Sequence, residues 1–348
     1  MGRIAIPEER NPLRLCVIPG DGIGREVVPA AVAVLQELLP DLEIVQADGG
    51  WDCFQRTGTA MPEATLQAVR TCGAGLFGAV SSPSRAVTGY RSAILTLRRE
   101  LELFANVRPV RSLPGLTSRE DVDLIVVREN TEGLYVGRER SEPGGAVAER
   151  RITEAASRRI GARALDLACG HSGGRLTIVH KANVLPLTDG LFRDSVRAVI
   201  GEAESPRVGD LIVDELLVDV AALKLLEAPQ RFGVIVTTNL FGDILSDAAA
   251  HWCGGLGLAP SLNWGEGVAV AEPVHGSAPD IAGTGAANPA AAILSAALLV
   301  RHVWQRPAMA DLIEGAVRRA MQASGPAAGT AAIGDAVRRN LEVAAASG

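Results

Sequence analysis

The sequence has 348 residues, of which 47% are hydrophobic and 38 are glycine, and its formal net charge is −6. This length and composition fit a folded chain of about two domains and exclude a disordered protein. No basic block favours nucleic-acid binding, no apolar run is long enough to span a bilayer, and the first residues show no signal-peptide pattern.

Strands and helices alternate along the sequence, because apolar runs are followed by amphipathic segments. We expect strands at 13–18, 42–47, 75–80, 123–127, 175–180, 210–213, 232–236 and 268–271. We expect helices at 25–39, 62–70, 93–103, 152–168, 190–200, 218–227, 289–305, 307–323 and 333–346, with a further helix after 239. The helix at 93–103 is expected to end near 106–109, and the polar segment 133–151 to form an arm or a hairpin. This order predicts an α/β fold with largely parallel sheets.

Two compositional details bear on chemistry and location. The five cysteines are scattered, odd in number and without CxxC spacing, which is typical of a reducing compartment and predicts a cytoplasmic protein without a zinc site. Only two lysines, Lys181 and Lys224, and two tyrosines, Tyr90 and Tyr135, are present. A retained lysine is a candidate for proton transfer, which arginine cannot perform, although drift would leave the same pattern.

Two glycine-rich loops follow predicted strands. The first, Gly20–Gly24, lacks GxGxxG spacing and a following acid at the usual distance, so a structural turn is favoured over a dinucleotide loop. The second, 272–289, could wrap a planar polar ligand, with a solvated loop as the alternative. Asp280 in it could accept hydrogen bonds from two ribose hydroxyls and would repel a 2′-phosphate, which favours NAD over NADP.

Acidic and basic side chains suggest a site for a metal and an acid. Asp243 and Asp247 are four residues apart and would share one face of a helix, where paired carboxylates suit a hard divalent cation. For an isolated pair, an N-cap and a surface acid is the alternative. Arg98, Arg108 and Arg128 lie near the ends of three expected elements and, if they converge, could bind a polyanionic acid; singly, each could be a surface charge.

These motifs resemble those of the β-decarboxylating dehydrogenase family, which includes isocitrate, homoisocitrate, 3-isopropylmalate and tartrate dehydrogenases. The resemblance covers nearly the whole chain, in family order, and rests on the strings at 18–24, 97–99, 106–109, 127–135, 180–185, 239–247 and 275–283. It implies an isopropylmalate dehydrogenase-like two-domain fold and not a classical Rossmann fold. Residues 1–107 and 254–348 would form a discontinuous cofactor-binding domain. Residues 108–253 would form a middle domain, with an arm at about 133–151 that clasps a second subunit.

The resemblance also implies roles for individual residues, in active sites shared across a homodimer that could pair into a tetramer. Asp243 and Asp247 would hold Mg²⁺ or Mn²⁺ together with Asp219 of the partner subunit, for which Asp214 is a nearby rival. Lys181 would act as the general base, with its pKa lowered by a cationic cleft, and Tyr135 would deliver a proton to C3. Substrate contacts would come from Ser92, Arg91, Arg98, Arg108 and Arg128, and NAD contacts from Asn183, His275, Gly276, Ser277, Ala278, Asp280, Ile281 and Asn288.

The helix start at 90–98 faces the C3 substituent of the substrate in this family. Ser92 is typical of isocitrate enzymes, but Ile94 replaces the Asn that they carry, and Ser followed by Ile resembles homoisocitrate dehydrogenases. Arg91 could reach a distal carboxylate or phosphonate, or could point into solvent. We therefore predict metal-dependent, NAD-linked oxidative decarboxylation of a homoisocitrate-like 3-substituted malate. Isocitrate, 3-isopropylmalate, tartrate and a 3-(phosphonomethyl)malate are alternatives, and a non-catalytic regulatory subunit is the rival from another class.

Overall fold

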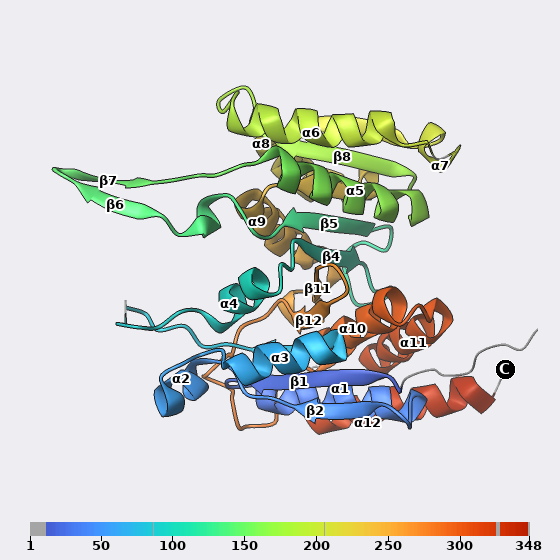
Figure 1. The fold of residues 1–348 in the computed structure, drawn as a ribbon. Coiled ribbons are helices and arrows are strands. Elements are labelled where there is room, and N and C mark those ends of the chain that lie inside the picture. Colours follow the sequence, from blue (N-terminus) through green and yellow to red (C-terminus); the bar gives the residue numbers. More distant parts are fainter. Residues whose placement is uncertain (1–11, 86, 205, 325–327, 347–348) are drawn as a thin grey trace, which may run out of the picture.

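One ten-stranded sheet runs through the protein, and helices cover both of its faces (Figure 1). The fold comes from a computed structural model that describes residues 12–85, 87–204, 206–324 and 328–346. The strands lie in the order β2 (Glu43–Gln46), β1 (Arg14–Gly20), β3 (Ala74–Ala79), β12 (Ala269–Pro273), β11 (Pro260–Trp264), β4 (Ala105–Arg111), β5 (Asp123–Glu129), β10 (Val234–Thr237), β8 (Arg175–His180) and β9 (Ile212–Leu217). Only the pairings of β11 with β12 and β4, and of β4 with β5, are antiparallel in this sheet. The predicted α/β fold with a largely parallel sheet is therefore confirmed.

Most helices cross between parallel strands, as the alternating pattern predicts. They are α1 (Gly24–Leu38), α2 (Trp51–Thr57), α3 (Glu63–Cys72), α4 (Ala93–Glu100), α5 (Glu154–Gly170), α6 (Thr188–Glu202), α7 (Pro206–Gly209), α8 (Val218–Glu227), α9 (Asn239–Ala249), α10 (Ala290–Leu298), α11 (Pro307–Ala323) and α12 (Thr330–Ala346). Strands β6 (Glu139–Glu142) and β7 (Gly145–Ala148) form a separate hairpin that extends away from the body (Figure 1). The arm or hairpin predicted at 133–151 is thus confirmed as a hairpin.

Several elements differ from the sequence prediction. The helix at 93–103 was predicted too long, since α4 ends at Glu100 and the segment that follows forms the central strand β4. This strand contains Pro109, which has no N–H to donate to a neighbouring strand. A proline therefore makes a central strand hard to predict from the sequence. Strand β11 and helix α2 were not predicted. In β11 the buried polar residues Ser261 and Asn263 interrupt the apolar run that marks a buried strand.

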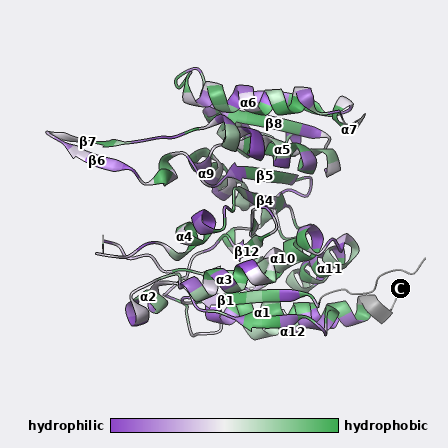
Figure 2. Ribbon diagram, viewed as in Figure 1, coloured by the Kyte–Doolittle hydropathy of each residue, from purple (hydrophilic) through white to green (hydrophobic). Residues whose placement is uncertain are grey.

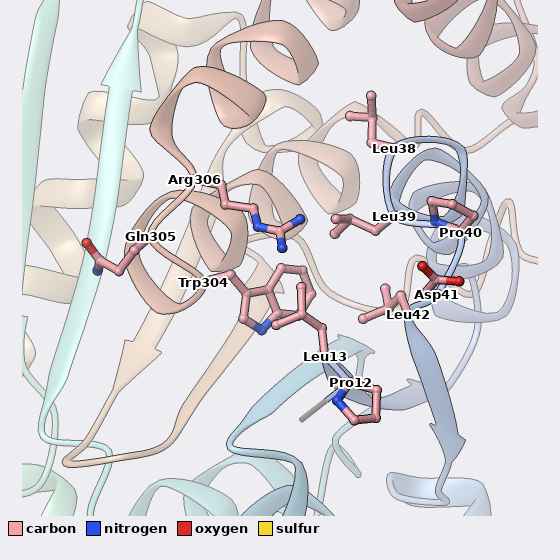
Figure 3. Close-up of a pocket in the computed structure, with 10 residues that line it drawn as sticks. All are labelled: Pro12, Leu13, Leu38, Leu39, Pro40, Asp41, Leu42, Trp304, Gln305 and Arg306. Carbon is pink, nitrogen blue, oxygen red and sulfur yellow. The ribbon is translucent and has the colours of Figure 1, made fainter. Parts of the chain in front are cut away.

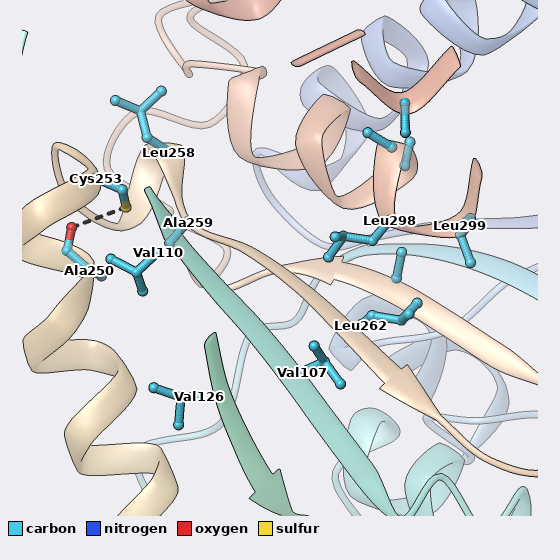
Figure 4. Packing of buried hydrophobic residues seen from close by; sticks show 14 of the residues in the cluster. Val107, Val110, Val126, Ala250, Cys253, Leu258, Ala259, Leu262, Leu298 and Leu299 are labelled. Atoms are coloured by element: carbon cyan, nitrogen blue, oxygen red, sulfur yellow. Dashed lines mark hydrogen bonds between the residues drawn. The ribbon is translucent and has the colours of Figure 1, made fainter. Parts of the chain in front are cut away.

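The core lies on both faces of the sheet and consists mainly of Val, Leu, Ile and Ala side chains. In Figure 2 the strands at the centre of the sheet are coloured hydrophobic, whereas strand β6 of the hairpin is coloured hydrophilic. Figure 4 shows strand residues Val107, Val126 and Leu262 in one buried cluster with Leu298 and Leu299 near the end of α10. Within the described residues, no helix has both the length and the apolar content needed to cross a membrane.

The sheet joins the two segments that were predicted to form separate domains. Strands β2, β1, β3, β12 and β11 come from outside residues 108–253, whereas β5, β10, β8 and β9 come from within that range. Strand β4 spans residues 105–111 and so contains the predicted boundary. The central antiparallel strands therefore form the connection between the two halves, and the division into two domains stays a prediction.

The first glycine loop has a structural role, as predicted. Asp21 is almost fully buried and accepts backbone N–H bonds from Trp51, Asp52 and Ser81 at 2.7, 3.0 and 2.9 Å. A Cβ at Gly22, where φ is +52°, would lie 2.2 Å from the carbonyl oxygen of Ser277. The turn therefore joins β1, α2 and β3 and lies directly against the second glycine loop.

A large surface pocket of about 700 Å³ opens at the other end of β1 (Figure 3). Its walls include Leu13, Leu39, Leu42 and Trp304, with Arg306 among the few charged side chains. Because Leu13 precedes β1 and the glycine turn follows it, this pocket and that turn lie at opposite ends of the strand. None of the residues described around this pocket belongs to the predicted site.

Candidate active site

A smaller pocket brings predicted substrate and cofactor residues together. It has a volume of about 170 Å³, and Ile94, Arg98 and Arg108 line it together with His275 and Gly276 of the second glycine loop. Arg98 comes from α4 and Arg108 from β4, so the pocket lies over the central antiparallel strands. Two of the three predicted carboxylate-binding arginines therefore face the same space as the predicted NAD loop.

Arg128, at the end of β5, is the most deeply buried of the three arginines, with 1% of its surface exposed. Its Nε and Nη2 donate to Oδ1 of Asn239 at 2.9 and 2.7 Å, and Nη1 donates to Asp243. Helix α9 can approach Arg128 this closely only because residue 242 is glycine. A Cβ at this position would lie 2.6 Å from the Arg128 side chain and would clash with it. Burial, together with the charges of Arg98 and Arg108, lowers the pKa of Arg128 to about 10. The three arginines thus converge, as predicted.

Arg98 and Arg108 are also buried, and polar groups hold each in place. Arg98 donates from Nη2 to Glu272 at 2.7 Å and from Nε to Asn263 at 3.0 Å. Arg108 donates from Nη1 to Asp247 and Ser246, both at 2.8 Å. Because each guanidinium carries five N–H donors, both side chains keep donors for a bound anion.

Asp243 and Asp247 lie one turn apart on α9, as the spacing predicts. Burial opposes ionisation of Asp243, but Arg128, Tyr135 and Arg108 lower the pKa of this carboxyl below its usual value. Partial burial and the charge of Asp243 raise the pKa of Asp247, against the opposing effect of Arg108. Each of the two carboxylates thus contacts a guanidinium group. Their oxygens are also the kind of ligand that Mg²⁺ or Mn²⁺ would bind.

Tyr135 lies in a short helical turn after β5 and donates its hydroxyl hydrogen bond to Asp243. Burial and this hydrogen bond raise the pKa of Tyr135, so the phenol keeps its proton at neutral pH. The Arg128 guanidinium lies over the Tyr135 ring, 4.9 Å from its centroid. Tyr135 is therefore fixed as a proton-bearing group beside the predicted metal ligands.

Lys181 and Asp219 form a second, separate charged pair at the ends of β8 and β9. The Lys181 Nζ donates to Asp219, whose side chain is 61% exposed. In the part of the chain that the structure describes, no third acid, Cys or His joins Asp243 and Asp247 in a metal-binding group. The rival Asp214 is engaged elsewhere, because it accepts hydrogen bonds from Arg175 and Thr177 at 2.7 and 2.6 Å.

The second glycine loop is anchored to the first loop and to α1. Ile23 donates its backbone N–H to the Ser277 carbonyl, and Glu26 accepts the N–H groups of Gly283 and Gly285 at 2.7 and 2.8 Å. Burial lowers the pKa of His275, whose Nδ1 lies 3.0 Å from the Gly276 carbonyl. A neutral ring that donates from Nδ1 leaves Nε2 as an acceptor, and this buried atom meets no partner among the described residues. The amino group of an adenine would fit that acceptor.

The sequence profile of the isocitrate/isopropylmalate dehydrogenase family matches residues 14–340. The chain belongs to this family. An isocitrate/homoisocitrate dehydrogenase of Thermus thermophilus is 54% identical over 87% of this chain and 89% of its own length. A 3-isopropylmalate dehydrogenase of Methanothermobacter thermautotrophicus is 50% identical, covering 89% of this chain and 91% of that relative. A homoisocitrate dehydrogenase of Methanocaldococcus jannaschii is 45% identical, covering 88% and 89%.

Solved structures agree with this assignment. The isocitrate dehydrogenase of Methylococcus capsulatus superposes with a TM-score of 0.87 at 39% identity and covers 94% of this chain and 99% of that one. The β-decarboxylating dehydrogenase of Thermococcus kodakarensis gives a TM-score of 0.83 at 42% identity, covering 96% and 97%. The protein is thus an NAD-dependent decarboxylating dehydrogenase that acts on a small molecule, from a family known to use NAD and divalent metals.

Other predicted contacts of this dehydrogenase lie at the margins of the site. Arg91 and Asn183 are exposed, and Ser92 is half-buried just before α4, where its side chain makes no capping bond. Asp280 is exposed in the second loop, with its carboxylate available to solvent. The side-chain oxygen of Asn288 accepts a hydrogen bond from the N–H of Ala290 at the start of α10. Arg91, Asn183 and Asp280 are thus accessible to ligands, and among them Asp280 carries the carboxylate that a ribose contact requires.

Sequence reasoning missed several polar residues that hold the dehydrogenase's arginines. All are buried. Four carry hydrogen bonds described above: Asn239, Ser246, Asn263 and Glu272. The fifth, Asn106, accepts a hydrogen bond from Nε of Arg108 at 2.7 Å. Asn106, Asn239 and Ser246 lie within the family strings at 106–109 and 239–247, but the sequence alone indicates no role for them. For Asn106, Asn263 and Glu272 the usable signal was a polar residue within a largely apolar strand, since buried polar groups are nearly always hydrogen-bonded. Asn239 and Ser246 lie on helix α9 and had no such signal.

Proposed function

We propose that this enzyme catalyses metal-dependent, NAD-linked oxidative decarboxylation of a 3-substituted malate, and that a homoisocitrate-like acid is its substrate. The observation that carries the proposal is the convergence of three buried arginines beside Asp243 and Asp247. A small acid with several carboxylates is the ligand class that such a set of guanidinium groups binds. The name of the Thermus thermophilus relative, isocitrate/homoisocitrate dehydrogenase, supports the choice within that class.

The roles of the protein groups follow from their charge and protonation. Arg98, Arg108 and Arg128 bind the carboxylates and fix the position of C2 and C3. Lys181 accepts the proton of the C2 hydroxyl during oxidation, and the bond from C3 to its carboxyl group then breaks to release CO₂. Tyr135, which keeps its proton at neutral pH, returns a proton to C3.

NAD and the metal complete this chemistry when bound. NAD⁺ supplies the hydride acceptor, and a Mg²⁺ or Mn²⁺ ion supplies polarisation of the C2 oxygen. Asp243 and Asp247 would hold the metal, and the second glycine loop with His275, Asp280 and Ile281 would hold the adenosine part of NAD. Asn183 would lie near the nicotinamide.

The third metal ligand and the base are proposed to come from a second copy of the chain. Helices α8 and α9 pack against each other and leave Val220, Leu223 and Ile244 exposed, and Leu187, which follows β8, is exposed as well. An apolar surface around charged active-site groups fits a homodimer interface. Lys181 and Asp219 of the partner subunit would then face Asp243 across this interface. The hairpin β6–β7 would clasp the partner, the predicted two domains would flank the cleft, and two dimers could form a tetramer.

A substrate panel tests the proposed reaction. Purified enzyme with Mg²⁺ and NAD⁺ is offered homoisocitrate, isocitrate, 3-isopropylmalate, tartrate and 3-(phosphonomethyl)malate, and NADH and CO₂ are measured. We expect the highest kcat/KM with homoisocitrate and equal amounts of both products. Absence of NADH with every acid would refute catalysis and favour the regulatory subunit, which the presence of Tyr135, Lys181 and the three aspartates argues against.

The choice of NAD over NADP is tested at Asp280. We expect Asp280→Lys to raise the KM for NAD⁺ and to lower the KM for NADP⁺, because a carboxylate that accepts ribose hydrogen bonds is replaced by a cation that attracts a 2′-phosphate. Unchanged NAD⁺ kinetics would remove Asp280 from the cofactor site. The KM for the acid substrate serves as the internal control.

A further inference from the structure

A row of buried polar side chains crosses the centre of the sheet. Asn263 of β11 lies opposite Asn106 of β4, and Asn106 lies opposite Arg128 of β5. Residues that pair across strands point to the same face of a sheet, so these side chains stand side by side. All three are at most 1% exposed. The row therefore brings polar groups from three strands beneath the pocket that Arg98 and Arg108 line.

Asn263 is the centre of this row. Its side-chain oxygen accepts hydrogen bonds from Arg98 Nε at 3.0 Å, Asn106 Nδ2 at 2.9 Å and Asn130 Nδ2 at 3.0 Å. Its Nδ2 donates to Oε1 of Glu272 at 2.8 Å and to the Val270 carbonyl at 3.3 Å. The opposite orientation of this amide would set donors against donors and oxygens against oxygens, so the network fixes how Asn263 points.

Two of the substrate arginines depend on this one side chain. Arg98 is bound to it directly, and Glu272, which also accepts from Arg98, is oriented by its amide group. Arg108 is bound indirectly, because its Nε donates at 2.7 Å to the oxygen of Asn106. Asn106 Nδ2 also donates to Ser261 Oγ at 2.8 Å, so loss of the Asn263 oxygen would remove one of the two acceptors that fix this amide. We therefore expect Arg108 to be displaced less than Arg98, which is bound to Asn263 directly.

We propose that Asn263 is a positioning residue that sets the spacing of the Arg98 and Arg108 guanidinium groups and so the fit of the acid substrate. This inference rests on the proposed function, in which those arginines bind the substrate carboxylates. Asn263 is fully buried beneath the site and acts only through the two arginines. Small displacements of positioning groups have large kinetic effects, because the binding geometry of several carboxylates is lost together.

The test separates positioning from general stability. Asn263→Leu has a similar volume but accepts no hydrogen bond, and we expect the KM for the acid to rise roughly tenfold or more, as for a lost hydrogen bond to a charged group. The KM for NAD⁺ should change less than about threefold, because the hydrogen bonds of Asn263 reach the second glycine loop only at its first residue, Glu272, and none of them joins Asn263 to the predicted NAD contacts at 275–288. If the leucine variant does not fold, Asn263→Ser is measured in its place, with the same direction expected.

The matched control is Thr177→Val. Thr177 is also fully buried in the sheet, and the substitution to valine removes its side-chain hydrogen bond to Asp214. Thr177 lies on β8, which is separated from β4 by two strands. It should lower Tm without changing the KM for the acid. An Asn263 variant that loses Tm like this control while keeping the wild-type KM would overturn the inference. A wild-type enzyme that oxidises none of the acids would instead overturn the proposed function, so the two failures are distinguished by the wild-type measurement.

Discussion

The predicted active site consists of two charged regions that differ in burial. The arginine–aspartate cluster (Arg98, Arg108, Arg128, Asp243 and Asp247) contains three nearly buried guanidinium groups that are fixed by hydrogen bonds from four strands and helices. In the Lys181–Asp219 pair, the Asp219 side chain is exposed and the Lys181 side chain is half-buried, and among the described residues each is the other's only ion-pair partner. Buried charges keep one geometry before a ligand binds, whereas an exposed pair can exchange partners at low energetic cost. The first region is therefore suited to substrate positioning and the second to meeting another chain.

The largest expected effect is on catalysis at the exposed pair. Lys181→Met should lower kcat roughly 10²- to 10⁴-fold, because the general base is lost, while Tm stays close to that of the wild type. Lys224→Met is the control, since Lys224 is the other lysine and pairs with Glu227 at the surface. Steady-state kinetics and thermal unfolding measure both. A kcat within threefold of wild type would exclude Lys181 as the base.

Removing a buried arginine should instead affect folding. Arg128→Met leaves Asn239 and the partly buried Asp243 without their guanidinium partner, and the free energy of unfolding should fall by about 3 kcal/mol. Urea denaturation measures this loss. Arg338→Met, which breaks the exposed pair with Glu37, should give no resolvable change. Equal urea midpoints for the two variants would contradict a stabilising role of the Arg128 contacts with Asn239 and Asp243.

Metal binding should depend on the substrate, because the two aspartates of one chain are already paired with arginines. Mg²⁺ together with the acid should raise stability by about 2.7 kcal/mol at a hundredfold excess over Kd, and Mg²⁺ alone by clearly less. Thermal shift measures both, and EDTA should reverse the effect. Asp247→Asn should remove the shift; an unchanged shift in that variant would exclude Asp247 as a ligand.

The smallest effect is a dependence on pH and salt. The pKa values of Asp243 and Asp219 are both lowered, Asp243 by Arg128 against burial and Asp219 by Lys181. Each carboxylate therefore contributes stability above its unfolded pKa and loses it as the pH falls through its folded pKa. In EDTA, Asp243→Asn and Asp219→Asn should each weaken the acid dependence of Tm.

Salt should then separate the two aspartates. High salt should abolish the effect of Asp219→Asn, because the Asp219 side chain is exposed. It should retain most of the effect of Asp243→Asn, because Asp243 is partly buried and its partner Arg128 is almost fully buried. Equal screening of both effects would mean that the two pairs do not differ in burial. The measurement is Tm against pH at low and high salt.

The fold class and several residues of the site could be predicted from the sequence. The strand–helix alternation gave the α/β fold, and the four-residue spacing of Asp243 and Asp247 placed them on one helix face, because α9 begins at Asn239. These signals depend on local period and spacing, which the sequence shows directly. The places of the three arginines near the ends of separate elements left their convergence open, and only the family resemblance implied a shared role in substrate binding.

The remaining features depend on contacts distant in sequence. Strands β4 and β11 were missed because their buried Asn and Ser residues break the apolar pattern, and those residues are polar because they hold the arginines. The partnership of Arg98 with Glu272 joins residues 174 positions apart. No local pattern reports such a pair, so the support beneath the arginines became apparent only in the fold.

The central claim is that one complete site contains the arginine–aspartate cluster of one chain and the Lys181–Asp219 pair of another. Two inactive variants, Lys181→Met and Asp243→Asn, are given different tags, co-expressed and purified as a mixed dimer. Each mixed dimer would contain one intact site, so we predict about half of the wild-type kcat per dimer. If both regions of a site belonged to one chain, the mixed dimer would have no intact site and would stay as inactive as its parents.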